Sequence, residues 1–146
     1  MHDNATTPMQ LASLMRRFAA MAYESLLLFA LSVLAGFAYI PIFGGIHGPF
    51  QKAVFQLYLL GVMMLYFVVF WKRGQTLAMK TWRIRLVGLD GGSPSTAQCT
   101  ARFCLAALGL LCGAAGFLWA LVDPDRQFLH DRLCKTRLAR QIELQR

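Results

Sequence analysis

The sequence predicts an all-α integral membrane protein, a small transmembrane helical bundle with two short cytoplasmic strand-like segments. Hydrophobic residues make up 57% of the 146 residues and the mean hydropathy is +0.47, which is unusual for a soluble domain. The chain has 15 Lys and Arg and 7 Asp and Glu residues, and all but one of them lie outside three apolar blocks. These blocks, residues 18–40, 53–71 and 103–122, are each close to the roughly 20 residues that cross a bilayer.

The first block follows Arg16 and Arg17 and contains Glu24, the one charged residue within the three blocks. The block is longer than the apolar core of a signal peptide, so we expect an anchor that stays. A carboxylate in a span costs about 3 kcal/mol, which makes Glu24 a candidate functional group that needs a partner. The alternative is that Glu24 lies at shallow depth and only fixes packing. Upstream, Thr7 and Pro8 predict the start of a helix.

Arg17 and Glu24 are seven residues apart, which places them on one helical face about 10 Å apart along the axis. Their backbone spacing is too large for direct contact. We therefore expect Arg17 to bind headgroups or a polar loop, while Glu24 faces the protein interior.

Residues 41–52 are rich in Gly and Pro and carry a single basic residue, Lys52, which predicts a turn on the outer side. His47 in this turn has no further metal ligands nearby, so we expect a solvated residue. The second block contains three mildly polar residues, Gln56, Tyr58 and Tyr66. It ends at Trp71, Lys72 and Arg73, a sequence typical of a membrane interface.

Residues 72–102 hold six basic residues against one acid, Asp90, so the positive-inside rule makes this segment cytoplasmic, together with the N-terminus. Residues 82–89 alternate as a strand does, with Arg83, Arg85 and Val87 on one face. The Asp90-Gly91-Gly92 turn follows, and residues 93–95 predict the start of the next helix.

The third block leaves two alternatives open. A single crossing would place six basic residues of the tail outside, against the charge rule. A block broken at Gly109, Gly113 and Gly116 could instead form a re-entrant hairpin that returns the tail to the cytoplasm. We favour the hairpin, because the tail resembles the cytoplasmic segment: Gln127 and Leu129 match Gln75 and Leu77, and residues 135–136 match 80–81. Two such segments can pair as strands only on one side of the membrane.

In the hairpin arrangement, a polar cluster forms beneath Glu24. Its expected members are Arg17, Arg102, Asp123, His130 and Asp131, and we expect Arg17, Arg102, His130 or Asp131 to be the partner of Glu24. The alternative is that Asp123 ends a helix before Pro124, while His130 and Asp131 bond locally and only tie the tail to the bundle.

Other function classes find little support in the sequence. There is no HExxH, no GxSxG, no phosphate-binding Gly-rich loop and no pair of catalytic carboxylates, so we expect no enzymatic activity and no cofactor. The four cysteines have neither metal-binding nor disulfide spacing, and we expect structural roles for Cys99, Cys104, Cys112 and Cys134. The basic residues that give the net charge of +8 flank the apolar spans, which favours anionic lipid over nucleic acid as the partner.

Three stretches resemble, in order and over most of the chain, the bacterial RDD membrane proteins: RRFAAMAYE, GQTLAMKTWRIRLVGLDGGSPS and FLWALVDPDRQFLHDRLCKTRLAR. The name of that family comes from an Arg at the start of the first helix, an Asp within that helix and a later Asp. The matching residues here are Arg17, Glu24 and Asp131. Glu24 departs from the pattern, because it keeps the carboxylate but has a longer reach.

The resemblance implies a single membrane domain over residues 1–146, in the cell inner membrane. It also implies transport of an ion or small solute, including cation or proton exchange, with Glu24 as the intramembrane ionisable group. With one such carboxylate in each chain, a transport path would require a homo-oligomer. The alternative is a structural or accessory membrane protein that moves no solute.

Overall fold

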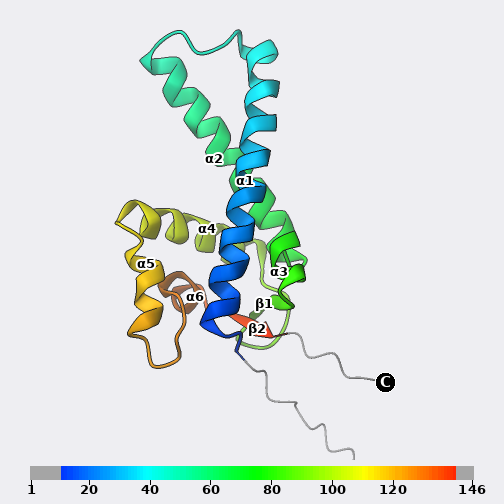
Figure 1. Ribbon diagram of the computed structural model, residues 1–146, viewed down its shortest axis with the longest axis vertical. Coiled ribbons are helices and arrows are strands. Elements are labelled where there is room, and N and C mark those ends of the chain that lie inside the picture. The colour runs from blue at the N-terminus through cyan, green and yellow to red at the C-terminus, as the bar shows by residue number, and fades with distance from the viewer. Residues whose placement is uncertain (1–10, 141–146) are drawn as a thin grey trace, which may run out of the picture.

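The computed structural model describes residues 11–140, so the helix start predicted at Thr7 and Pro8 lies outside the described residues. The elements follow one another from α1 to β2 (Figure 1). They are α1 (Leu14–Phe43), α2 (Pro49–Lys72), α3 (Leu77–Thr81), β1 (Ile84–Gly88), α4 (Thr96–Leu111), α5 (Ala115–Leu118), the 3-10 turn η1 (Trp119–Leu121), α6 (Leu129–Leu133) and β2 (Thr136–Arg140).

The first two apolar blocks form α1 and α2, which lie side by side and diverge toward the turn that joins them (Figure 1). Helix α1 ends where Gly44 takes a left-handed φ of 75°, and α2 begins with Pro49 at its first turn. Both helices are long and apolar enough to cross a membrane. Little of either span is buried within the protein, since the buried share of the most apolar 18-residue window is 11% in α1 and 0% in α2. Most of their surface is therefore available to face lipid.

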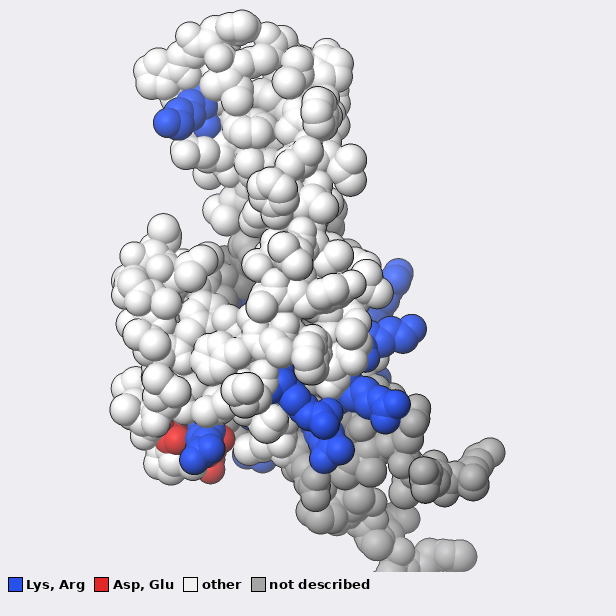
Figure 2. All heavy atoms as spheres, viewed as in Figure 1, with Lys and Arg blue, Asp and Glu red and all other residues white. Residues whose placement is uncertain are grey.

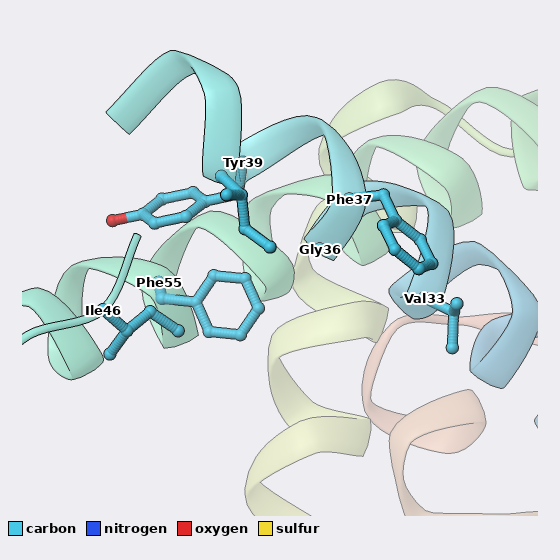
Figure 3. A pocket seen from close by; sticks show the side chains of 7 residues that line it. Val33, Gly36, Phe37, Tyr39, Ile46 and Phe55 are labelled. Carbon is cyan, nitrogen blue, oxygen red and sulfur yellow. The ribbon is translucent and has the colours of Figure 1, made fainter. Parts of the chain in front are cut away.

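Where α1 and α2 diverge, an open apolar pocket of about 220 Å³ lies between them (Figure 3). Tyr39 is almost fully buried beside it and its ring contacts the rings of Phe43, Phe55 and Tyr58. Aromatic packing thus joins the two helices near the turn between them.

The third block is broken, as the glycine cluster predicts. Helix α4 starts with a capping box between Ser95 and Gln98 and ends at Leu111, and the chain then turns by 103° into the α5–η1 segment. Gly113 and Ala114 make this turn with φ values of 73° and 63°. A pair of helices bent in this way is either a broken span or a re-entrant loop, so both alternatives for the third block stay open.

The two predicted strands pair. Strands β1 and β2 are antiparallel with Leu86 opposite Leu138, and Leu11 forms an isolated bridge with Ala139 of β2. The tail, the segment after α2 and the start of α1 therefore lie together at one end of the molecule (Figure 1). Strand β1 is shorter than the expected strand over residues 82–89, and Val87 is buried although Arg85, expected on the same face, is exposed.

The hydrophobic core lies at this end, around the sheet. Its fully buried members come from four elements and the loop before α6, and they include Ala78, Leu86, Cys99, Ala120 and Phe128. Lys and Arg side chains gather around the same end, whereas the parts of α1 and α2 near their connecting turn carry almost no charge on the face shown in Figure 2. The charge pattern therefore separates a membrane part from a polar end.

Candidate functional site

Glu24 is buried on α1, with 8% of its surface exposed, and both of its carboxylate oxygens accept hydrogen bonds from hydroxyl groups. The Tyr66 hydroxyl on α2 donates to Oε1 over 2.6 Å, and the Thr76 hydroxyl donates to Oε2. Thr76 also caps α3, because its Oγ1 accepts a bond from the Met79 amide at 3.2 Å. Glu24 thus joins α1, α2 and the start of α3.

These partners are not the ones expected from the sequence. Arg17, Arg102, His130 and Asp131 were expected to pair with Glu24, but the hydrogen bonds of its carboxylate come from neutral hydroxyls. Tyr66 was noted only as a mildly polar residue of the second span, and Thr76 was missed. The signal for Thr76 was its place as an N-cap directly after the Gly74-Gln75 turn.

The other predicted residues form a second cluster near the sheet. Arg102 on α4 forms a buried ion pair with Asp131 on α6, and its guanidinium lies 4.6 Å from the centre of the Trp71 ring. Arg17 on α1 is close enough to interact electrostatically with Asp131 and Arg102. Four of the five expected members are therefore brought together, namely Arg17, Arg102, His130 and Asp131.

Arg17 is fixed to the loop before α6. Its guanidinium donates to the Arg126 carbonyl over 2.7 Å and lies 5.9 Å from the centre of the Phe128 ring. Because 2% of Arg17 is exposed, this residue does not extend to headgroups as predicted. It binds a polar loop, which was the other expectation for it.

His130 is neutral in this cluster at physiological pH. Burial, together with the nearby charge of Arg102, lowers the pKa of His130 to about 4, although Asp131 partly opposes the shift. The ring contacts Phe117 and Phe128, and its Nε2 is 3.8 Å from the Asp131 carboxylate. His130 therefore adds a polar group but no charge.

Asp123 does not join this cluster but acts locally. Its carboxylate accepts the Gln127 amide at 3.0 Å and pairs with Arg132, and its own amide bonds to the Trp119 carbonyl. The bond from Gln127 and the charge of Arg132 lower the pKa of Asp123, against the effect of burial. This is the local role given above as the alternative for Asp123.

The second cluster, formed by Arg17, Arg102, His130 and Asp131, contains buried polar atoms that make no hydrogen bond. Within residues 11–140, the buried side-chain atoms without a hydrogen-bond partner all belong to it. They are Arg17 Nε, Arg102 Nε, His130 Nδ1 and Asp131 Oδ2. Such a mixture of donors and acceptors suits a small polar molecule such as water.

A metal site is not evident in the part of the chain that the structure describes, where no three His, Cys, Asp or Glu residues group suitably. The four cysteines are free thiols, with Cys99 and Cys134 buried and Cys104 and Cys112 exposed on the apolar α4 and the turn after it. Burial raises the pKa of Cys134, which keeps it a thiol.

The comparison with protein families gives one match, to the RDD family, over residues 11–135. Neither the search of curated proteins nor the search of solved structures gave a match. The matched range covers most of the chain and includes Arg17, Glu24 and Asp131, the three positions on which the resemblance rests. This integral membrane protein belongs to the RDD family.

Proposed function

We propose that the protein transports an ion, by proton or cation exchange, and that Glu24 is the group that changes its charge during transport. The observation that carries the proposal is the neutral surroundings of Glu24. It is a buried carboxylate on an apolar helix, and its hydrogen-bond donors are the hydroxyls of Tyr66 and Thr76.

The contrast with the other buried acids supports this choice. Asp131 is paired with Arg102, and Asp123 is paired with Arg132, so each of these acids is in direct contact with a cation. Glu24 has no such partner among its hydrogen bonds. Of the three, Glu24 is the acid whose charge is not cancelled by direct contact.

Hydroxyl partners suit a group that exists in two charge states. A hydroxyl can donate to a carboxylate and, after rotation, accept from a carboxylic acid, whereas a guanidinium can only donate. Both the ionised and the protonated form of Glu24 can therefore be satisfied by Tyr66 and Thr76. A cation that replaces the proton would find the same oxygen atoms as ligands.

Flux through liposomes tests the proposal. We expect purified wild-type protein to carry protons or monovalent cations across the membrane, and Glu24→Gln to abolish the flux while the protein still folds. Ser32→Ala is the matched control, because Ser32 lies on the same helix and its hydroxyl only bonds to the Leu28 carbonyl. Equal fluxes for wild type and Glu24→Gln would remove Glu24 from transport.

The alternative is an accessory membrane protein, and one observation favours it: Glu24 ties together three elements, which is also a structural role. In that case wild-type protein moves no ion in liposomes, and Glu24→Gln changes stability or assembly instead. The assay thus separates the two functions.

The proposal includes a multi-pass location in the inner membrane of a bacterial cell, with the sheet end and the N-terminus in the cytoplasm. This location is supported by the basic side chains around the sheet (Figure 2).

We propose anionic lipid as the partner of these basic residues, with an attraction of about 1 kcal/mol per basic residue near the surface. We propose that a homo-oligomer completes the transport path, since each chain supplies one such intramembrane carboxylate. The proposal assigns no enzymatic activity, no cofactor and no nucleic-acid binding.

A further inference from the structure

Two segments of the chain have the same order of secondary structure, a turn, a short helix and a strand. Residues 71–88 contain a turn, α3 and β1, and residues 123–140 contain a turn, α6 and β2, each residue of the second being numbered 52 higher. Both contain a five-residue helix followed, after the same spacing, by a five-residue strand. We call residues 71–88 the first unit and residues 123–140 the second unit.

The backbone of the two units agrees in its unusual features. The residue before each strand is left-handed, with φ of 53° at Arg83 and 54° at Lys135. The residue that closes each first turn is also left-handed, with φ of 90° at Gly74 and 50° at Arg126. Since positive φ is uncommon outside glycine, this agreement at non-glycine positions is a specific one.

The hydrogen bonds agree as well. The Gly74 amide donates to the Trp71 carbonyl over 2.8 Å, and the amide of the equivalent Arg126 donates to the Asp123 carbonyl over 2.9 Å. Between each short helix and the strand that follows it, the Arg83 amide donates to the Lys80 carbonyl over 3.2 Å, and the Lys135 amide donates to the Arg132 carbonyl over 3.3 Å. The match in structure also corrects the one made from sequence, because Lys135 corresponds to Arg83 rather than to Lys80.

The strand register makes the two units symmetric. Leu86 lies opposite Leu138, its own equivalent, while Ile84 lies opposite Arg140 and Gly88 opposite Thr136. Such a register defines a local two-fold axis between Leu86 and Leu138. The apolar blocks that precede the units follow the same offset, since residues 53–71 correspond to 105–123, close to the third block.

Helix α1 contacts both units at equivalent turns. Glu24 accepts its hydrogen bond from Thr76, which caps the helix of the first unit. Arg17 donates to the Arg126 carbonyl and lies over Phe128, the residue that precedes the helix of the second unit. Phe128 is the equivalent of Thr76, so each of these two α1 residues meets one copy of the same turn.

We propose that the protein is built from two copies of one structural unit, and that Glu24 and Arg17 are positioning residues that each fasten α1 to one copy. This inference goes beyond ion transport and does not depend on it. It gives the two family positions on α1 separate tasks, one for each unit.

Hydrogen exchange tests the two attachments separately. We expect Glu24→Gln to speed amide exchange about tenfold in residues 76–81 and Arg17→Gln to do so in residues 128–133, each leaving the other unit unchanged. An equal effect of either variant on both units, or no effect on either, would overturn the assignment.

An exchange of side chains tests the duplication itself. The quadruple variant Ile84→Thr, Thr136→Ile, Val87→Ala and Ala139→Val swaps buried residues between equivalent positions. A hydroxyl at position 84 would face the Met79 carbonyl, as the Thr136 hydroxyl faces the Asp131 carbonyl at 3.5 Å. The control places the same four side chains at non-equivalent positions: Ile84→Ala, Val87→Thr, Thr136→Val and Ala139→Ile.

We expect the exchanged variant to unfold cooperatively in detergent at a temperature well above that of the control. Equal destabilisation of both variants would mean that the units are not equivalent. Neither the hydrogen-exchange measurement nor the thermal unfolding measurement depends on ion flux. Failure of this inference and failure of the proposed function can therefore be told apart.

Discussion

At the scale of single residues, the buried cations and acids of the two clusters are equal in number. Arg17 and Arg102 are the buried cations, and Glu24 and Asp131 are buried acids of the same two clusters. Arg102 and Asp131 cancel by contact, which leaves Arg17 and Glu24, seven residues apart on α1, as the remaining pair. The two clusters are linked through α1.

His130 makes the stability of the fold depend on pH. Its folded pKa of about 4 is below its ordinary value of 6.5, so the unfolded protein takes up the proton first. Stability is fully present above pH 6.5 and falls as the pH drops toward 4, by up to about 1 kcal/mol per pH unit. Chemical denaturation in detergent at a series of pH values checks this.

The control for this prediction is His130→Phe, because the neighbours of the ring are Phe117 and Phe128 and a phenyl ring keeps the aromatic packing. Its free energy of unfolding should vary less between pH 6.5 and 4 than that of the wild type. The same slope for both proteins would show that another group controls this range.

How much of the site could be read from the sequence differs between its residues. Glu24 is evident, because a lone carboxylate in an apolar helix is conspicuous. Its donors are not, since Thr76 is 52 residues away and becomes a partner only through the packing of α3 on α1. The Arg102–Asp131 pair could be anticipated only once the tail was expected to return to the side of the loop.

At the scale of elements, the break in the third block decides the topology. A straight helix through residues 103–122 would carry the tail away from β1, whereas the turn at Gly113 brings β2 beside it. The close approach of α4 and α5 depends on glycine, because a Cβ on Gly109 would lie 3.3 Å from the Gly116 Cα. Composition predicted a break, but the angle and the contact that fix it depend on atomic detail.

Gly109→Val should separate α4 from α5. We expect a loss of about 1–3 kcal/mol in the free energy of unfolding, since the neighbouring atom is backbone and cannot rotate away. Gly61→Ala is the matched control on α2, because no atom lies within 4 Å of the added Cβ and alanine favours a helix. Thermal unfolding in detergent should place Gly61→Ala at or above wild type, and a Gly109→Val protein as stable as that control would refute the close contact.

At the scale of the whole molecule, the structure places both ends of the described chain at the sheet, which is the most basic part of the surface (Figures 1 and 2). The charge rule and the strand pairing are independent observations. The first concerns the preference of Lys and Arg for one side of the membrane, and the second concerns hydrogen bonds between distant segments. Both lead to the same arrangement, with the turn between α1 and α2 on the opposite side.

Reporter fusions test this arrangement. A fluorescent protein that matures only in the cytoplasm should fluoresce when fused after Asp90 or after Arg146, and a phosphatase that is active only outside should report activity after Gly45. The fusion after Gly45 serves as the control, because both topologies of the third block place this turn outside. Phosphatase activity after Arg146 would separate the tail from the cytoplasmic loop by a membrane. Strands β1 and β2 could then not pair, and Asp131 could not reach Arg102 as the structure has it.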